Sequence, residues 1–403
     1  RKIKNNTIIS AKVPDSPDHL ILYVTGKCGA RCEFCFYGNE INQKDPVTGQ
    51  FYELTMEEIT GISEGLGKLS QVAFTGGDPF LRTDLTEIAK LFWKNNKPEA
   101  IHIPTNGLPI AQVKKTTMEI LKTIPCDLTI AMSLDSVGET YDKVRGVPGN
   151  FDKMMQMYDM LAALKKTYPK KLHLVVNTVI TNVTYKTLPE LIKHVRERMP
   201  ALDYHDCDLV RGDPYKASVA LPEFNKLVTE VRPLLHDNYD YWFKTKAGAA
   251  LKKFEYDLKL ETIQKKTQVL PCVAGETYMV ITERGNVCFC ELREPIGNIR
   301  NNTVKEIWKS DKAEKLRESI RRKDCHCTHG CFMPLSILYN LKNLKIDAKI
   351  IKYMFKKTMP IDVQLIESGK VDKIHFEGLV NVGDTSPSDV IPIQAGFWKD
   401  TNK

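Results

Sequence analysis

A regular alternation of short apolar runs and longer amphipathic segments extends from about residue 20 to residue 210. Short β-rich runs followed by segments of helical period are typical of repeated βα units around a parallel sheet. The predicted strands are Leu20–Thr25, Gln71–Thr75, Ala100–Ile103, Leu128–Leu134, Leu172–Ile180 and Tyr204–Leu209. The predicted helices are Met56–Leu69, Thr83–Asn95, Ala111–Thr123, Phe151–Tyr168, Thr187–Met199 and Pro222–Leu235. Six such units are too few for a closed eight-stranded barrel, so the pattern predicts an α/β fold, a partial (β/α)6 TIM-like barrel, with its site at the carboxyl ends of the strands.

Three cysteines lie in the loop that follows the first predicted strand: Cys28, Cys32 and Cys35. With eleven cysteines in 403 residues, this spacing should arise by chance in about one such chain in a hundred. A [4Fe–4S] cluster normally takes four thiolates, so three close ligands leave one iron open to a small molecule. A structural zinc site is the alternative, but zinc requires four nitrogen or sulfur ligands, and no further Cys or His lies within forty residues after Cys35.

The Cys-x3-Cys-x2-Cys spacing, with the aromatic Phe34 before the last cysteine, resembles the signature of the radical S-adenosylmethionine (SAM) enzymes. In that family the open iron is chelated by the amino and carboxylate groups of SAM, and an electron from the cluster cleaves the sulfonium to a 5′-deoxyadenosyl radical. The run Gly76-Gly77-Asp78-Pro79 after the second strand resembles the family's Gly-Gly-Glu motif, whose backbone holds the SAM amino group. Asp78 replaces the glutamate and keeps a carboxylate. Taken alone, the run is a turn.

Polar residues at later strand ends lie where this family binds SAM. The resemblance implies SAM contacts for Asn106, in Thr105-Asn106-Gly107, and for Ser133, Asp135 and Arg145. Taken singly, a surface arginine or a helix-capping aspartate is an ordinary alternative. Asn177 lies inside an apolar strand and needs a polar partner, for which SAM is one candidate. Val210-Arg211-Gly212-Asp213-Pro214 after the sixth strand is a candidate for the substrate entrance.

A second group of cysteines follows the predicted barrel. It comprises Cys272, Cys288, Cys290, Cys325, Cys327 and Cys331, around a predicted hairpin of Tyr278–Thr282 and Val287–Cys290 and a helix over Val304–Ile320. This arrangement resembles the twitch or SPASM domains that carry auxiliary iron–sulfur clusters in radical SAM enzymes. The complete SPASM pattern has seven cysteines for two clusters, so the resemblance implies one auxiliary cluster, bound by Cys272, Cys290 and two of Cys325, Cys327 and Cys331. A zinc site from the same residues is the alternative.

Three other cysteines are expected to pack in the interior, and two histidines are candidates for supporting metal ligands. Cys288 alternates with Cys290 on one strand and therefore points to the opposite face, where we expect it to pack. Cys126 and Cys207 lie in or beside apolar strands and are expected to be buried small hydrophobic residues. His326 and His329 lie within the last cysteine cluster and are candidates for supporting its metal ligands.

Composition narrows the class of protein. The net charge of +8 is dispersed among acidic residues, without the concentrated basic stripe that nucleic-acid binding requires. Cysteines grouped at short spacing, with no secretory signal, favour metal binding in a reducing cytoplasm. No apolar run approaches the length of a membrane span. Ile346, Ile350, Ile351, Met354 and Phe355 alternate with lysines as a basic amphipathic helix, which is expected to cover its own domain, with peripheral membrane contact as the alternative.

The predicted organisation has five parts. They are an N-terminal extension (1–17), a radical SAM partial barrel (18–240), a linker or helix (241–264), a twitch/SPASM-like domain (265–335) and a C-terminal helical cap or tail (336–403). The resemblance implies an enzyme that uses a deoxyadenosyl radical to take a hydrogen atom from its substrate, with electrons from a donor such as flavodoxin or ferredoxin. Only 27 residues precede Cys28, which weakens a peptide substrate and leaves a sugar-like or carbohydrate-linked metabolite as the preferred one.

Other functions remain open from the sequence. Related enzymes with this layout also modify ribosomal peptides and lipid precursors, so a peptide or a lipid-linked substrate is a second possibility. A non-catalytic iron–sulfur or zinc scaffold would bind metal without turning over SAM. A SAM-dependent methyltransferase is a further rival, although no Gly-x-Gly-x-Gly-like loop follows the first strand.

Overall fold

The computed structural model describes residues 14–340. The chain forms two compact units, each built from separated stretches of sequence. In the described part, the barrel unit comprises residues 14–220 and Ala274–Glu318, and the second unit comprises Leu221–Val273 and 319–340. The basic amphipathic helix predicted around Ile346 lies outside the described residues, as do most of the N-terminal extension and most of the C-terminal part. The domain boundaries from the sequence stay predictions.

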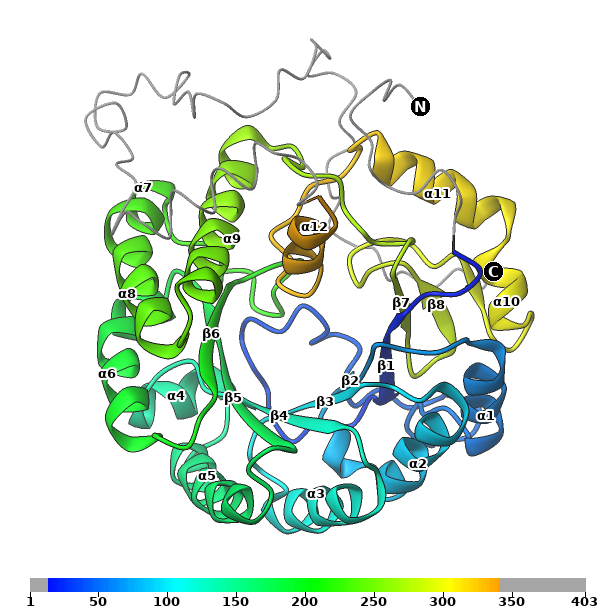
Figure 1. Cartoon of the computed structure of the whole chain (residues 1–403), viewed down its shortest axis with the longest axis horizontal. Coiled ribbons are helices and arrows are strands. Elements are labelled where there is room, and N and C mark those ends of the chain that lie inside the picture. Colours follow the sequence, from blue (N-terminus) through cyan, green and yellow to red (C-terminus); the bar gives the residue numbers. More distant parts are fainter. Residues whose placement is uncertain (1–13, 341–403) are drawn as a thin grey trace. The chain divides into compact units, whose positions relative to one another are not determined.

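The barrel unit is built on a curved sheet whose first six strands are parallel (Figure 1). These strands are β1 (His19–Thr25), β2 (Gln71–Gly76), β3 (Ala100–Thr105), β4 (Asp127–Ser133), β5 (Leu172–Ile180) and β6 (Tyr204–Leu209). They lie side by side in sequence order, from β1 to β6. All six predicted strands are confirmed to within a residue or two, and the sheet is the partial barrel that the alternation predicts. Its carboxyl ends therefore bring six loops to one edge.

Helices follow the strands and lie on the outer side of the curved sheet (Figure 1). They are α1 (Met56–Gly65), α2 (Leu85–Asn96), α3 (Ile110–Thr123), α4 (Gly138–Arg145), α5 (Asn150–Thr167) and α6 (Leu188–Arg198), with 3-10 turns at η1 (Pro79–Leu81) and η2 (Thr184–Thr187). Thr55 begins α1 with a capping box that includes Glu58. Each helix buries one apolar face; in α2 that face includes Ile88, Ala89 and Phe92.

Three more strands extend the same sheet beyond β1. They are β7 (Tyr278–Ile281), β8 (Asn286–Cys288) and β9 (Gly297–Asn298), of which β7 pairs with β1 in parallel and the others continue antiparallel. The predicted hairpin is thus present, although the second strand ends at Cys288. The single helix predicted over Val304–Ile320 is wrong: α10 (Val304–Trp308) ends at Lys309, and α11 (Asp311–Arg321) begins after Ser310. The Ser310 hydroxyl accepts the backbone N–H of Ala313, an N-cap that starts a new helix.

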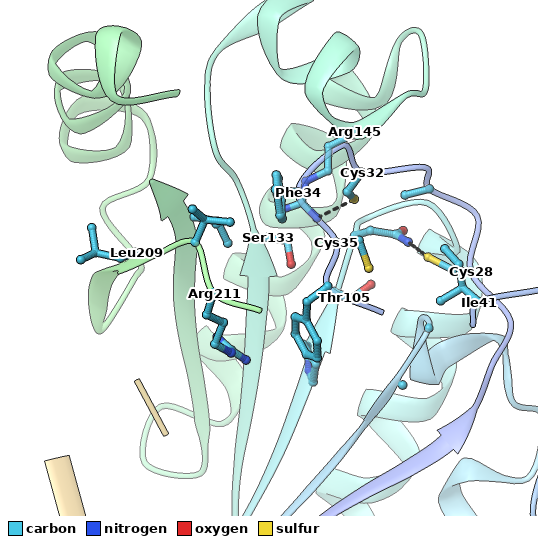
Figure 2. A pocket seen from close by; sticks show the side chains of 18 residues that line it. Cys28, Cys32, Phe34, Cys35, Ile41, Thr105, Ser133, Arg145, Leu209 and Arg211 are labelled. Carbon is cyan, nitrogen blue, oxygen red and sulfur yellow. Dashed lines mark hydrogen bonds between the residues drawn. The ribbon is translucent and has the colours of Figure 1, made fainter. Parts of the chain in front are cut away.

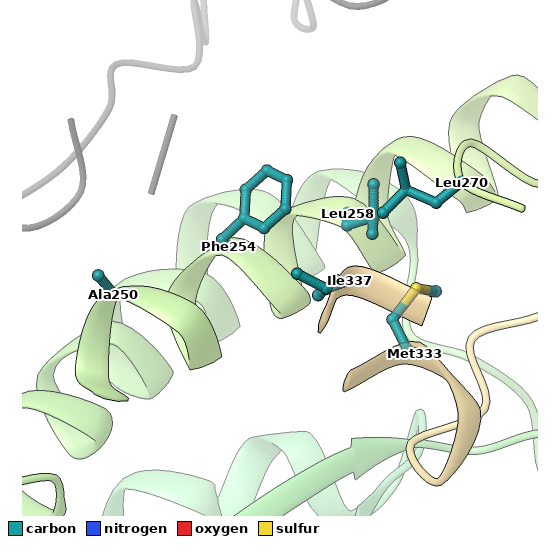
Figure 3. Close-up of a cluster of buried hydrophobic side chains, with 6 residues drawn as sticks. All are labelled: Ala250, Phe254, Leu258, Leu270, Met333 and Ile337. Carbon is teal, nitrogen blue, oxygen red and sulfur yellow. The ribbon is translucent and has the colours of Figure 1, made fainter. Parts of the chain in front are cut away.

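The second unit is helical. It contains α7 (Phe224–Lys226), a π-helical turn η3 (Leu227–Val231), α8 (Arg232–Trp242), α9 (Lys246–Lys265) and α12 (Phe332–Asn340). The stretch 241–264, predicted as a linker or helix, is largely covered by the 20-residue helix α9. Its apolar residues form a core with α12, drawn in Figure 3: Ala250, Phe254, Leu258, Leu270, Met333 and Ile337.

Charged residues of α9 are buried because they are paired. Asp257 accepts two hydrogen bonds of 2.6 Å from the guanidinium of Arg232, and Lys259 lies 2.6 Å from Glu255. Burying such charges without partners would cost several kcal/mol. Several charges of α9 therefore point into the second unit, toward partners on α8 or on α9 itself. Among the described residues, no helix combines the length and the apolar character needed to cross a bilayer.

Candidate active site

The three cysteines of the first loop line one open pocket of about 810 Å³ at the carboxyl edge of the sheet (Figure 2). The loop begins directly after β1 and has no regular secondary structure across Cys28, Cys32 and Cys35. The strand ends contribute the rest of the lining, from Gly76 and Gly77 to Asn106, Ser133, Val179 and Arg211. This is the position where the alternation of strands and helices predicts an active site.

Backbone hydrogen bonds hold the cysteine loop against its neighbours. The N–H of Arg31 donates to the carbonyl of Arg145 at 2.8 Å, and the N–H of Tyr215 donates to the carbonyl of Cys35 at 3.0 Å. At the other end, the side-chain amide of Asn42 pairs with the peptide groups of Cys28. The Cys28 N–H donates to Asn42 Oδ1 at 3.0 Å, and Asn42 Nδ2 donates to the Cys28 carbonyl at 2.9 Å. These four hydrogen bonds therefore hold the loop at its start, its middle and its end.

The glycine pair after β2 packs directly against this loop. The N–H of Gly77 donates to the carbonyl of Thr25 at 2.9 Å, and the N–H of Asp78 donates to that of Lys27 at 2.7 Å. A Cβ on Gly76 or Gly77 would overlap the carbonyl oxygens of Thr25 and Lys27, and Gly76 has φ of +113°. Only glycine permits this close approach. The two glycines therefore form one wall of the pocket and also fix the start of the cysteine loop.

The Asp78 carboxylate organises a neighbouring strand end and does not line the pocket. It accepts hydrogen bonds from the Thr105 hydroxyl and the Asn106 N–H, both at 2.9 Å, and from the Phe80 N–H at 3.1 Å. Burial raises its pKa, against these donors. The Asn106 side chain in turn donates to Cys28 Sγ at 3.6 Å. Asp78 therefore positions Asn106, which lines the pocket.

A buried guanidinium lies beside the cysteines. Arg145 pairs with the fully buried Asp135 at 2.5 Å and donates to Cys32 Sγ at 3.4 Å. Burial alone would lower the pKa of Arg145, but the nearby Asp135 carboxylate outweighs it and the pKa is raised, so the cation persists. The Arg145 Nε is buried and has no hydrogen-bond partner in the described part of the chain. This edge of the cation therefore keeps a donor that the described residues do not use.

Burial also governs the thiols. It raises the pKa of Cys28 to about 11 and that of Cys35 to about 12, and it raises that of Cys32 against the lowering effect of Arg145. Such thiols release their protons when a metal binds them. Within residues 14–340, no three His, Cys, Asp or Glu side chains converge on one ion position. In an iron–sulfur cluster each thiolate binds a different iron, so three thiols of one loop suit a cluster that leaves one iron open.

Two protein-family models match the chain. The Radical SAM superfamily model matches residues 22–195, and the iron–sulfur cluster-binding domain SPASM matches residues 272–332. Together the matches span more than half of the chain. The chain belongs to the radical SAM superfamily. Its cofactors are [4Fe–4S] clusters and SAM, and it is an enzyme rather than a non-catalytic scaffold, as the resemblance predicts.

Individual relatives of this radical SAM enzyme are distant. It is 24% identical over 297 residues to the AdoMet-dependent heme synthase of Methanosarcina barkeri, covering 66% of this chain and 76% of the relative. It is 22% identical over 335 residues to the cysteine-type anaerobic sulfatase-maturating enzyme of Clostridium novyi, covering 78% and 85%. The crystal structure of Streptococcus suis SuiB bound to S-adenosylmethionine is similar with a TM-score of 0.54 and 18% identity, covering 75% of this chain and 68% of that one. That likeness concerns the fold.

Most of the residues predicted to bind SAM or the catalytic cluster line the pocket of the radical SAM enzyme. They are Cys28, Cys32, Phe34, Cys35, Gly76, Gly77, Asn106, Ser133 and Arg145. Four others do not: Asp78, Pro79, Asp135 and Asn177. Asp78 and Asp135 hold Asn106 and Arg145, whereas Pro79 begins the turn η1 and Asn177 stands in register with Ser133 on the next strand. Sequence reasoning missed Asn42, which carries no motif and is recognisable only from its contacts.

A second part of the pocket lining is mostly apolar and includes Arg211, which pairs with a carboxylate. Phe36, Val179, Leu209 and Val210 line it. The guanidinium of Arg211 lies 5.0 Å from the centre of the Phe36 ring and 3.3 Å from the Glu291 carboxylate. The Tyr23 hydroxyl also donates to Glu291, at 2.7 Å. Figure 2 shows Leu209 and Arg211 apart from Arg145, so the pocket lining holds a second cation at a separate place.

The second cysteine group is divided between the two compact units. Cys290 belongs to the barrel unit, whereas Cys272, Cys325, Cys327 and Cys331 belong to the second unit. In the second unit the N–H of Cys331 donates to Nδ1 of the buried His329 at 3.2 Å, and the N–H of Cys327 donates to Gln268 at 3.3 Å. The ligand set of one auxiliary cluster stays a prediction. Cys126, Cys207 and Cys288 are buried, as expected for packing residues.

Proposed function

We propose that this chain cleaves SAM reductively and abstracts a hydrogen atom from a bound substrate. The observation that carries the proposal is one pocket lined by three thiols, a glycine pair and a buried guanidinium with an unpartnered Nε. Once bound there, the cluster and SAM supply a 5′-deoxyadenosyl radical, which can take a hydrogen atom from an unreactive C–H bond. The protein's task is to orient the cofactors and keep water away from them.

Cys28, Cys32 and Cys35 would bind the cluster, each through its thiolate. Arg145 would neutralise the carboxylate of SAM through its available Nε while its other nitrogens hold Asp135 and Cys32. Gly76 and Gly77 would present backbone groups to the SAM amino group, and Asn106 and Ser133 would bind its polar parts from neighbouring strand ends. Phe34, whose ring lies 5.1 Å from the Arg145 guanidinium, would cover the cation.

The substrate is proposed to enter along the apolar wall that ends at Arg211. Sequence alone favours a sugar-like metabolite, but no relative with broad coverage supports it. A peptide is the stronger candidate, because SuiB, which resembles this chain in fold over 76% of the chain, was crystallised with the precursor peptide SuiA. The heme synthase relatives keep a different class of substrate open.

The proposal also includes an electron donor and an auxiliary cluster. An external donor such as flavodoxin or ferredoxin would deliver the electron, in a reducing cytoplasm where buried thiols and clusters persist. One auxiliary cluster, held by Cys272, Cys290 and two of Cys325, Cys327 and Cys331, would accept an electron from the product or anchor the substrate.

The deciding experiment is SAM cleavage without oxygen. The purified chain is reconstituted with iron and sulfide, mixed with SAM and dithionite, and assayed for 5′-deoxyadenosine and methionine, which reductive cleavage produces in equal amounts. The matched control is the variant with Cys28, Cys32 and Cys35 all changed to Ala. Product from the wild-type protein only supports the proposal, whereas a loaded wild-type cluster that yields no 5′-deoxyadenosine argues against it.

Substrate class is tested by adding candidates to the same assay. A panel of short peptides and a panel of sugars and nucleotide sugars are compared by 5′-deoxyadenosine yield and by mass spectrometry of the additive. A peptide substrate should raise the yield and change mass in proportion to the deoxyadenosine formed. Stimulation by sugars alone would contradict the peptide assignment.

A further inference from the structure

The turn between β7 and β8 lies at the same end of the sheet as the cysteine loop. Strand β7 runs parallel to β1, with His19 opposite Tyr278 and Leu22 opposite Ile281. Both strands therefore end at the same edge, where β1 leads into Cys28 and β7 leads into Glu283, Arg284 and Gly285. The turn belongs to the segment that matches the SPASM model, yet it is part of the barrel unit.

The Glu283 side chain is completely buried beneath the cysteine loop. The Tyr37 hydroxyl lies 2.7 Å from both carboxylate oxygens and donates to them. The Glu283 Cγ also lies 3.6 Å from the position a Cβ would take on Gly26, just before the loop. A carboxylate without any exposed surface is costly unless donors satisfy it, so an apolar residue of similar size would serve packing better. A role for the hydrogen bond from Tyr37 would account for the free-energy cost of burying the Glu283 carboxylate.

Arg284, the next residue of the turn, contacts the same loop from its outer side. Its guanidinium lies 2.8 Å from the Glu40 carboxylate, donates to Gln43 Oε1 at 2.6 Å and stacks 4.0 Å above the centre of the Tyr52 ring. The charged groups around Glu283 are Arg284, whose Nε lies 3.5 Å from its carboxylate, and Glu40, while Tyr37 is a neutral donor. Two adjacent side chains of one turn hold one continuous segment, residues 37–43.

That segment is joined to the cysteines at both ends. Tyr37 is the second residue after Cys35, and Asn42 makes the reciprocal hydrogen bonds with the peptide groups of Cys28. The Tyr37 ring also packs edge-on against Tyr23 of β1, with ring centres 5.0 Å apart. A shift of this segment would move the first and the last thiol together.

We infer that Glu283 is a positioning residue for the catalytic cluster, acting through Tyr37, so that the β7–β8 hairpin sets the geometry of the cysteine loop. The hairpin thereby has a role in the barrel besides carrying Cys290. Groups that orient metal ligands in this way typically change affinity or activity by about tenfold or more when removed. The inference rests on the proposed function for its activity readout only.

The test compares four variants reconstituted with iron and sulfide. Glu283→Leu removes the acceptor, Glu283→Gln keeps an oxygen that accepts from Tyr37, and Tyr37→Phe removes the donor. Glu294→Gln is the matched control, because Glu294 lies near the same hairpin, is half exposed and pairs with its neighbour Arg293. Each protein is measured by iron content, by the electron paramagnetic resonance spectrum of the reduced cluster with and without SAM, and by 5′-deoxyadenosine formation. The spectra are also recorded in a Cys290→Ala background, in which the three active-site cysteines are intact. In that background the catalytic cluster gives the signal.

The expected result is a graded one. Glu283→Leu and Tyr37→Phe should lose the change that SAM causes in the spectrum and lower the rate of SAM cleavage by about tenfold or more, at near-normal iron content. Glu283→Gln should recover most of both, and Glu294→Gln should match the wild type. Wild-type spectra and rates in Glu283→Leu and Tyr37→Phe would overturn the inference. If Glu283→Leu does not fold, the inference is decided by comparing the spectra and rates of Tyr37→Phe with those of Glu283→Gln.

The spectrum separates this inference from the proposed function. If the wild-type protein binds SAM at its cluster but forms no 5′-deoxyadenosine, the proposed function fails, while the spectra of the variants still test Glu283. If the wild type cleaves SAM and every variant does so equally, the proposed function stands and the inference fails.

Discussion

The two cysteine groups of this radical SAM enzyme are organised in opposite ways. Cys28, Cys32 and Cys35 lie on one loop of one compact unit and share one pocket. Cys290 lies on the barrel unit, whereas Cys272, Cys325, Cys327 and Cys331 lie on stretches of the second unit that are separated by some fifty residues in sequence. A site built on one loop is determined by local spacing and local hydrogen bonds. Segments separated in this way depend on the fold around them, so spacing alone does not identify which of these cysteines bind one metal group.

The largest effect is expected from the first group itself. Changing Cys28, Cys32 and Cys35 together to Ala should abolish SAM cleavage and remove about four irons per chain, while iron bound by the second group remains. Iron analysis and 5′-deoxyadenosine assays of the same preparation check this. Loss of all iron from this variant would show that the two groups are not independent.

The glycine wall of the pocket should be nearly as sensitive. Gly77→Ala places a Cβ against the carbonyl of Lys27, which must move with the start of the cysteine loop. Because backbone strain of this kind costs a few kcal/mol, we expect SAM cleavage to fall by about a hundredfold. Gly61→Ala, on the open surface of α1, is the control. Equal activity in both variants would contradict the role of Gly77.

The second group is probed by a pair of neighbouring cysteines. Cys290→Ala should lower the iron content by one cluster and leave SAM cleavage within about tenfold of the wild type. Cys288→Ala removes a buried side chain from the opposite face, so it should lower the free energy of unfolding by about 1 kcal/mol and leave the iron unchanged. Iron analysis and denaturant unfolding distinguish the two. The reverse result would exchange the assignments of ligand and packing residue.

The smallest effect is expected at Asn42. Asn42→Gly keeps the left-handed backbone, for which φ is +59°, and removes the amide that pairs with Cys28. Two hydrogen bonds to a positioned peptide group correspond to about a fivefold loss in SAM cleavage. Asn42→Ala loses the same hydrogen bonds and also strains the left-handed backbone. Comparing the two variants therefore separates the effect of the lost hydrogen bonds from the effect of backbone strain. An unchanged rate in Asn42→Gly would mean that backbone contacts alone hold Cys28.

Periodicity predicted the barrel well because each strand and helix buries residues with its own repeat. It failed where local chemistry overrides the repeat. Ser310 caps a new helix inside a continuous helical pattern, and α9 hides its charges in pairs such as Arg232 with Asp257. Motifs indicated the cysteines and glycines, since their spacing is a local property. Asn42 and Glu283 could not be predicted, because their roles follow from contacts with residues up to 246 positions away.

The parallel pairing of β1 with β7 has a practical consequence for dissecting the molecule. A shortened chain that stops at residue 220 would keep every strand of the six-unit barrel but lose β7, which pairs along β1. The unpaired N–H and C=O groups of β1 would then form an exposed edge, and such edges associate with one another. A soluble barrel fragment therefore has to include residues 274–318, or carry charged substitutions along the edge of β1.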